Sequence, residues 1–239
     1  MKIIIPAAGD GTRFADAGYE EPKPLIDVLG KPMVIRVADN VVPRDEEGDH
    51  FDEDELIIIT QEKHHVDLKD YWGNGRVLAI DQPTEGAVCT ILVAEPFLKD
   101  DQPIIIANCD QLVDFDVNDF IATDLDGRIV TFPSNKDHHS YVLLDDNGII
   151  TDIKEKEVIS NHAVTGVYFF KSSAAFIRAA KTVIDHDRRT KGEFYVSSVI
   201  DQMIKDGLHL TAYQANSTML GTPEELQHFL VAASVAKTL

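Results

Sequence analysis

The residues best suited to chemistry stand near the start of the sequence, directly after a short apolar run. The run is followed by a loop of small residues that ends in a cation, Ala7-Ala8-Gly9-Asp10-Gly11-Thr12-Arg13. Small residues let backbone N–H groups approach a phosphate chain without interference from a Cβ. The guanidinium of Arg13 can hold two phosphate oxygens at once. The loop therefore predicts a phosphate site, although two glycines after a strand also occur in ordinary turns.

A second cation follows in the segment Glu21-Pro22-Lys23-Pro24. Two prolines restrict the backbone on either side of Lys23, so its ammonium group sits on a stiff loop. A rigidly held cation can stabilise charge that develops on phosphorus. Neither a dinucleotide fingerprint nor a Walker loop is present, because Phe14 replaces the third glycine and no Gly-Lys-Ser/Thr follows. The two cations thus indicate chemistry on a phosphate chain bound in another way.

Further polar residues follow two later apolar runs. Gln82 and Gly86 come after the first of these runs, and Asn108 and Asp110 come after the second. Gln82 can donate and accept together, as base recognition requires. A carboxylate just past a buried strand is costly unless it is paired or binds a metal, and Mg2+ prefers one or two carboxylates plus phosphate oxygens. The structural alternatives are a polar turn residue at Gln82 and a turn or helix-capping aspartate at Asp110.

Strands and helices alternate along the chain and must position these residues. The apolar runs predict strands at Lys2–Pro6, Leu56–Thr60, Arg76–Ile80, Pro103–Ala107, Arg128–Phe132, Tyr141–Leu144, Ile149–Ile153, Val164–Phe170 and Leu208–Gln214. The amphipathic stretches predict helices at Met33–Asn40, His64–Tyr71, Ala87–Glu95, Val117–Thr123, Ser173–Ile184, Glu193–Lys205 and Pro223–Val235. Strand-helix alternation indicates a mostly parallel sheet in three layers, with ligands beyond the carboxyl ends of the strands.

The string G-D-G-T-R, then P-K-P, then Gly30-Lys31-Pro32-Met33 resembles the sugar-phosphate nucleotidylyltransferases, also called nucleoside-diphosphate-sugar pyrophosphorylases. Weaker motifs extend the resemblance over nearly the whole chain, and it is closest to short capsule-type members and small-acceptor cytidylyltransferases. The resemblance implies an α/β fold, a three-layer α/β/α sandwich with a mostly parallel mixed central sheet (nucleotide-diphospho-sugar transferase, Rossmann-like). It also implies one nucleotidyltransferase domain, 1–239, with an NTP-binding half (1–115) and an acceptor-binding half (116–239).

The same resemblance implies a role for each matching residue. Arg13 and Lys23 are the expected catalytic residues, and Asp110 is the expected ligand of the cofactor Mg2+. The expected nucleotide-binding residues are Ala7, Ala8, Gly9, Gly11, Thr12, Gln82 and Gly86. The expected acceptor-binding residues are Asn108, Lys156, Gly166 and Glu193.

Two departures from the family pattern affect these roles. Glu157 stands where the family's E-K-P has proline, so Lys154 is a rival to Lys156 as the holder of the acceptor's phosphate. Met219 stands where many members have an aspartate that serves as a second metal ligand. Asn216 and Glu224 lie near it in sequence, but neither matches the family position.

The implied reaction is Mg2+-dependent transfer of NMP from an NTP to a small phosphorylated acceptor, with release of pyrophosphate. CTP is mildly preferred, and the acceptor is a sugar 1-phosphate, as in capsule or cell-surface polysaccharide synthesis. Alternatives are a cytidylyltransferase for a non-sugar acceptor and a non-catalytic nucleotide-binding regulatory protein. A glycosyltransferase is a further alternative, since Asp114-Phe115-Asp116 has the D-x-D form of a metal motif.

Composition limits the partners of the protein. The chain has 239 residues and a net charge of -19, which argues against nucleic acid and anionic membranes as partners. Two cysteines make no disulfide framework, and no apolar run is long enough to enter a membrane. Met1 leads into a strand rather than a signal peptide, so we expect a cytoplasmic protein, with a homo-oligomer possible. The acidic stretch Asp45–Glu55 is expected to form a solvated loop.

Overall fold

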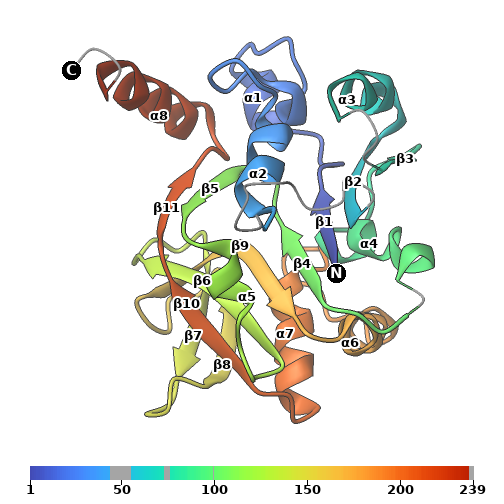
Figure 1. The fold of residues 1–239 in the computed structure, drawn as a ribbon, viewed down its shortest axis with the longest axis vertical. Helices are drawn as coiled ribbons and strands as arrows, with labels where there is room; N and C mark the ends of the chain where they lie inside the picture. The colour runs from blue at the N-terminus through green and yellow to red at the C-terminus, as the bar shows by residue number, and fades with distance from the viewer. Residues whose placement is uncertain (44–54, 73–75, 99, 237–239) are drawn as a thin grey trace.

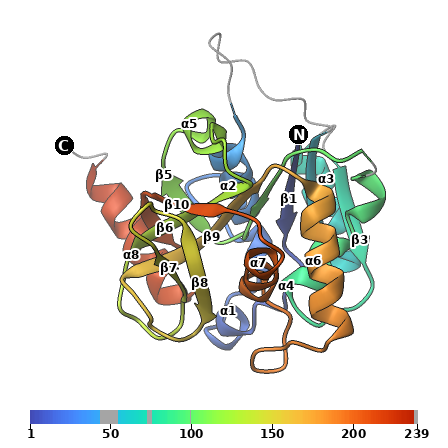
Figure 2. The same ribbon diagram turned by 90° about the horizontal axis from the view of Figure 1, so that it is seen from below.

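A mixed β-sheet runs through the molecule and carries helices on both faces (Figures 1 and 2). The computed structural model describes residues 1–43, 55–72, 76–98 and 100–236. Over these residues the sheet has nine strands, seven in the order β10-β6-β9-β4-β1-β2-β3, with β7 and β8 attached beside β9. The strands are β1 (Lys2–Pro6), β2 (Leu56–Gln61), β3 (Arg76–Ile80), β4 (Ile104–Ala107), β6 (Gly127–Pro133), β7 (Ser140–Leu144), β8 (Ile150–Glu155), β9 (His162–Phe170) and β10 (Leu210–Gln214).

Parallel pairing brings the loops that follow β1 and β4 to one edge of the sheet. Strand β1 pairs in parallel with β2 on one side and with β4 on the other, and Ile4 lies opposite both Ile57 and Ile106. Strand β9 runs antiparallel between β4 and β6. The small-residue loop and Asp110 therefore leave the sheet side by side, at the carboxyl ends of the strands where a ligand site was expected.

The apolar strands are covered from both sides, which gives the predicted three layers. Ile3, Ile4 and Ile5 have no exposed surface. Because side chains alternate along a strand, Ile4 packs with α4, α6 and α7, whereas Ile3 and Ile5 pack with α2, α3 and α5. The helices are α1 (Thr12–Asp16), α2 (Met33–Val41), α3 (His65–Trp72), α4 (Ala87–Leu92), α5 (Val117–Ile121), α6 (Ser173–Asp185), α7 (Val196–Lys205) and α8 (Pro223–Ala236).

Some elements of the fold differ from the prediction. The strands β5 (Gln111–Asp114) and β11 (Asn216–Met219) form a separate antiparallel pair that the sequence pattern did not indicate. Helix α7 begins at Val196 rather than at Glu193. The reason is that Phe194 is held in a loop contact, in which its N–H donates to the carbonyl of Glu85 over 2.9 Å.

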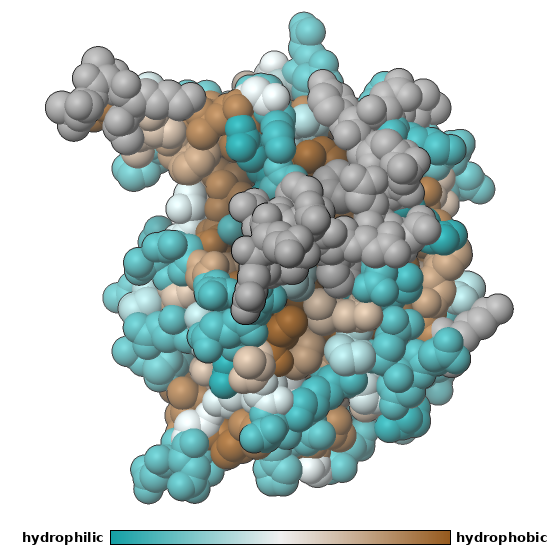
Figure 3. All heavy atoms as spheres, in the orientation of Figure 1, coloured by the Kyte–Doolittle hydropathy of each residue, from teal (hydrophilic) through white to brown (hydrophobic). Residues whose placement is uncertain are grey.

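Helix α8 lies to one side of the sheet at the end of the chain (Figure 1). Its first turn is closed by a reciprocal cap, in which the backbone N–H of Thr222 donates to Glu225 and that of Glu225 donates to the Thr222 hydroxyl. On the face shown in Figure 3, hydrophobic residues gather in small patches, including one on α8. No helix within the described residues is both long and apolar enough to span a bilayer. Residues 45–54 of the acidic stretch lie outside the described residues.

Candidate active site

A cavity of about 550 Å³ opens at the sheet edge where β1 and β4 end. Its wall contains most of the residues predicted for the site: Ala7, Ala8, Gly9, Gly11, Thr12, Arg13, Lys23, Gly86, Asn108, Asp110 and Glu193. Gln82, Lys156 and Gly166 are not part of this wall, although Gln82 adjoins it as the exposed neighbour of Pro83. Segments far apart in the sequence thus converge on one cavity.

The small-residue loop and the lysine loop are fitted to one another at Gly11. This glycine has a φ of 62°, a region that favours glycine, and a Cβ placed there would lie 2.9 Å from the Cβ of Lys23. Directly after it, Phe14 is buried, while Arg13 is exposed. The buried phenyl ring anchors the loop and leaves the guanidinium free to meet a ligand in the cavity.

Lys23 and Asp110 form an ion pair in the wall of the cavity. The Lys23 Nζ lies 2.5 Å from Asp110 Oδ2, and the two side chains are 19% and 24% exposed. Burial acts to lower the pKa of Lys23, but the neighbouring Asp110 carboxylate outweighs it, so the pKa lies above the ordinary lysine value. Lys23 therefore carries a full positive charge at neutral pH, held against a carboxylate that follows β4.

Glu225 is the second carboxylate near Asp110. Between them lies Gly221, where a Cβ would sit 2.9 Å from Asp110 Oδ2 and 3.5 Å from Glu225 Oε2. Glu225 is part of the cap of α8 and does not stand at position 219, where many family members have an aspartate. A carboxylate in the cavity wall with another close by fits Mg2+, which takes its other ligands from phosphate and water. No group of three or more His, Cys, Asp or Glu residues able to hold a metal occurs in the described chain.

Cys109 also lines the cavity, between Asn108 and Asp110, and its thiol is buried. Burial raises its pKa to about 11, with the Asp110 carboxylate acting in the same direction and Lys23 opposing it. The thiol is therefore protonated at neutral pH, which makes it a poor nucleophile and a poor metal ligand.

The Gly86 loop is joined to the segment that carries Glu193. A Cβ on Gly86 would lie 2.6 Å from both the N and the O of Phe194, so only glycine fits there. Phe194 also receives a hydrogen bond from the Val88 N–H over 3.2 Å. Arg189 completes the junction, since it lies over the Phe194 ring at 4.2 Å and its Nη2 lies 2.9 Å from Glu85 Oε1.

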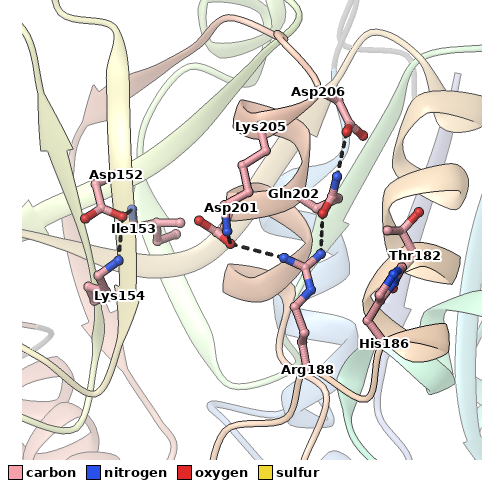
Figure 4. A network of polar contacts seen from close by, with 10 residues as sticks. All are labelled: Asp152, Ile153, Lys154, Thr182, His186, Arg188, Asp201, Gln202, Lys205 and Asp206. Carbon is pink, nitrogen blue, oxygen red and sulfur yellow. Dashed lines mark hydrogen bonds and ion pairs between the residues drawn. The ribbon is translucent and has the colours of Figure 1, made fainter.

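A polar network fixes the other side of the same segment (Figure 4). Arg188, which follows α6, pairs with Asp201 over 3.4 Å and donates to Gln202, both on α7. Lys205 pairs with the same Asp201 over 2.5 Å. The loop that leads to Glu193 is therefore anchored to α7 as well as to the Gly86 loop.

Gly166 supports the cavity wall from behind. It has a φ of 100°, and a Cβ there would lie 2.2 Å from Asn108 Nδ2. The Asn108 N–H donates to the Gly166 carbonyl over 2.9 Å. The glycine thus makes room for the Asn108 side chain, which itself lines the cavity.

Lys156 reaches the cavity through a residue that the sequence did not single out. Its Nζ donates to the phenol of Tyr195 over 2.5 Å, and Tyr195 lines the cavity. Lys154 instead pairs with Asp152 of its own strand over 2.8 Å (Figure 4). The structure brings Lys156 to the site and leaves Lys154 on its neighbouring carboxylate.

Gln61 is a second residue that the sequence prediction missed. It is buried at the end of β2, and its Nε2 donates to the Ala8 carbonyl over 2.9 Å and to Asp10 over 3.1 Å. Its position just past an apolar run was the same signal that identified Gln82.

The structure gives Asp116, the second aspartate of the D-x-D motif, a role in capping a helix. Its side chain accepts a hydrogen bond from the Asn118 N–H over 2.8 Å at the start of α5.

Comparison with known proteins identifies the family of the chain. The family model for nucleotidyl transferases matches residues 2–228. The bifunctional protein GlmU of Thermodesulfovibrio yellowstonii is 26% identical over 89% of this chain, which spans only 47% of that longer relative. The UTP–glucose-1-phosphate uridylyltransferase AglF of Haloferax volcanii is 24% identical over 94% of this chain and 93% of its own length. A nucleoside-diphosphate-sugar pyrophosphorylase structure from Vibrio cholerae superposes with a TM-score of 0.77, 20% identity and coverage of 95% and 99% of the two chains. Since the family model covers nearly all of its length, the chain belongs to the nucleotidyl transferase family of enzymes.

Proposed function

We infer that this enzyme transfers NMP from an NTP to a sugar phosphate or a similar small phosphorylated acceptor and releases pyrophosphate. The observation that carries the proposal is the Lys23–Asp110 pair in the wall of a cavity that Arg13 also lines. The names of AglF and of the Vibrio structure support a sugar phosphate as the acceptor. The proposed division of labour gives residues 1–115 to the nucleotide and 116–239 to the acceptor, with Asn108 reaching across.

The chain's own residues bind and orient the two phosphates. Arg13 and the backbone of the small-residue loop hold the β- and γ-phosphates, and Lys23 stabilises the charge that develops at the α-phosphate. The acceptor's phosphate monoester is a nucleophile at neutral pH, so no general base is required and catalysis rests on positioning. Asp110, with Glu225 beside it, would hold Mg2+, which neutralises phosphate charge when bound.

The base and the acceptor are the finer parts of the proposal. The sequence resemblance favours CTP mildly, whereas the AglF name specifies UTP, so Gln82 and the Gly86 loop are proposed to read a pyrimidine. The acceptor is proposed to be a sugar 1-phosphate used for cell-surface polysaccharide. A non-sugar phosphate is the alternative, since the acceptor-side wall offers Glu193 and Tyr195 as general polar partners.

A matrix of four NTPs against a panel of phosphorylated acceptors tests the proposal, with pyrophosphate release as the readout. The panel should include glucose 1-phosphate, inositol 1-phosphate and phosphocholine, with glucose as the control that lacks phosphate. We expect one NTP and acceptor pair to release pyrophosphate, and Asp110→Asn to abolish it. NTP binding without pyrophosphate release from any pair would instead favour a regulatory nucleotide-binding protein.

A further inference from the structure

Lys156 is a cation held by a neutral partner beside the cavity. Its Nζ donates to the Tyr195 phenol over 2.5 Å and lies 4.4 Å from the centre of that ring. Two other basic residues around the site have carboxylate partners, Asp110 for Lys23 and Glu85 for Arg189. Lys156 takes part in none of the ion pairs found among the described residues. Its positive charge is therefore available to an anion.

The carboxylate next to Lys156 in sequence is turned to other partners. Glu155 accepts hydrogen bonds from the hydroxyls of Ser140 and, over 2.8 Å, of Ser197. Both serines belong to elements that flank β8, so the carboxylate is satisfied without the lysine. In a chain with a net charge of -19, leaving one ammonium without an acidic partner beside a cavity calls for a ligand that supplies the negative charge.

The backbone at Lys156 is held in an uncommon conformation. Its φ is 57°, in the left-handed region that costs a non-glycine residue free energy. The Lys156 N–H donates to the carbonyl of His139 over 3.0 Å, which ties this turn to the start of β7. In this strained backbone conformation the Lys156 side chain lies against Tyr195.

The Tyr195 phenol has donor capacity left. It accepts from Lys156, and none of the hydrogen bonds found between described residues uses its own hydrogen. Burial raises the pKa of Tyr195, so the phenol stays protonated at neutral pH. A phenol that accepts one hydrogen bond can still donate another. Because Tyr195 lines the cavity and Lys156 does not, the phenol is the part of the pair that faces the ligand space.

We propose that Tyr195 is a positioning residue for Lys156, the lysine that the family resemblance already assigns to the acceptor's phosphate, and that its phenol adds a second donor to that subsite. The inference rests on the proposed function and adds a residue to it. The phenol holds the ammonium beside the cavity and donates its own O–H to a second phosphate oxygen. The alternative is a structural role, in which Tyr195 merely precedes α7 and fills space.

Chemical labelling of lysines tests the subsite without turnover. The whole protein is acetylated at limiting reagent with increasing inorganic phosphate, the smallest ligand with the acceptor's phosphoryl group, and the modified lysines are quantified by mass spectrometry. Chloride at matched ionic strength is the control. We expect phosphate to protect Lys156, and Tyr195→Phe to raise the half-protecting concentration about tenfold, whereas Lys154 keeps its labelling. Equal protection of Lys156 in wild type and Tyr195→Phe, or none in either, would overturn the proposal.

Kinetics separate positioning from a structural role. Tyr195→Phe should raise the acceptor KM about tenfold, which corresponds to about 1.4 kcal/mol, and change the NTP KM less than twofold. In the Lys156→Met background the same change should have a smaller effect than in the wild type, because the phenol no longer positions an ammonium and only its own hydrogen bond to the phosphate is lost. Tyr213→Phe removes a phenol hydroxyl outside the cavity and is the matched control. Equal changes in both KM values, or effects that multiply in the double variant, would show a structural role.

The two proposals fail in different ways. Protection of Lys156 by phosphate in a protein that releases no pyrophosphate keeps the anion subsite and overturns the proposed function. Pyrophosphate release by a protein whose Lys156 is not protected keeps the function and overturns the subsite.

Discussion

Replacing Lys23 with alanine is expected to have opposite effects on turnover and on metal binding by the nucleotide-free protein. The Lys23 ammonium lies 2.5 Å from Asp110 Oδ2, so it occupies an oxygen that a divalent cation would use. A hydrogen bond between charged groups contributes about 1.5–3 kcal/mol, and both side chains are mostly buried. Removing the ammonium should therefore tighten the binding of a divalent cation at least about tenfold.

Turnover should fall in the same variant. Loss of one preorganised cation costs about 3 kcal/mol of barrier, which is roughly a hundredfold in rate. The assay pairs pyrophosphate release with titration of Mn2+ into nucleotide-free protein, read by electron paramagnetic resonance. Circular dichroism checks that the variant is folded.

Lys205→Ala is the matched control for this experiment. It removes a lysine at the same 2.5 Å from an aspartate, Asp201, with the same change in net charge but outside the cavity. Any effect of overall charge on Mn2+ binding appears in both variants. The reasoning is refuted if Lys23→Ala binds Mn2+ no tighter than Lys205→Ala, or if it keeps wild-type turnover.

Three further predictions follow from the same contacts. Gly86→Ala should lower the free energy of unfolding by about 2 kcal/mol in urea, because the added Cβ would lie 2.6 Å from backbone atoms of Phe194. Unchanged stability would show that the Gly86 loop and Phe194 are not tightly packed. Glu85→Arg and Arg189→Glu should each raise the acceptor KM a few-fold, and the double variant should restore it, whereas additive losses would exclude a role for their pairing. Burial, followed by the neighbouring His138 and Lys136, lowers the pKa of His139 to about 4. Below pH 6.5 the unfolded chain therefore binds a proton that the folded protein does not, and the free energy of unfolding falls as the pH drops toward 4. After allowance for solvent screening, the loss of stability is about 1.5 kcal/mol. Unfolding at pH 4 and pH 7 should show this loss in the wild type and in His228→Gln, which changes an exposed histidine, but not in His139→Gln.

The sheet was predictable because its central strands, such as β2 and β4, are buried on both faces. Unbroken apolar runs such as Ile3-Ile4-Ile5 are typical of such strands. Because the strands pair in parallel, the loops that follow them lie at one edge of the sheet. The β5–β11 pair was not predictable, because its short segments are mixed in polarity and their pairing joins residues 111–114 to 216–219. Local pattern carries no information about a pairing over that separation.

The site divides in the same way between local and long-range information. Gly11 and Lys23 could be recognised from the motif formed by their neighbours in sequence. The structure shows why the motif needs a glycine at this point, because a Cβ on Gly11 would collide with the side chain of Lys23. Tyr195 has no such signal, because its importance comes from Lys156, on a separate turn. Glu225 could have been identified as the N-terminal cap of α8 from T-P-E-E, but not as the neighbour of Asp110.

Contacts between the two halves of the cavity wall have a consequence for the order of events. The Gly86 loop, proposed for the nucleotide, touches Phe194 directly, and Phe194 stands between Glu193 and Tyr195, proposed for the acceptor. A nucleotide that shifts Gly86 must move Phe194 with it, because there is no space between them to absorb the shift. Binding of one substrate is therefore expected to alter the affinity for the other, and linkage requires the two effects to be equal. The proposed acceptor subsite thus contains a residue whose placement depends on the loop proposed for the nucleotide.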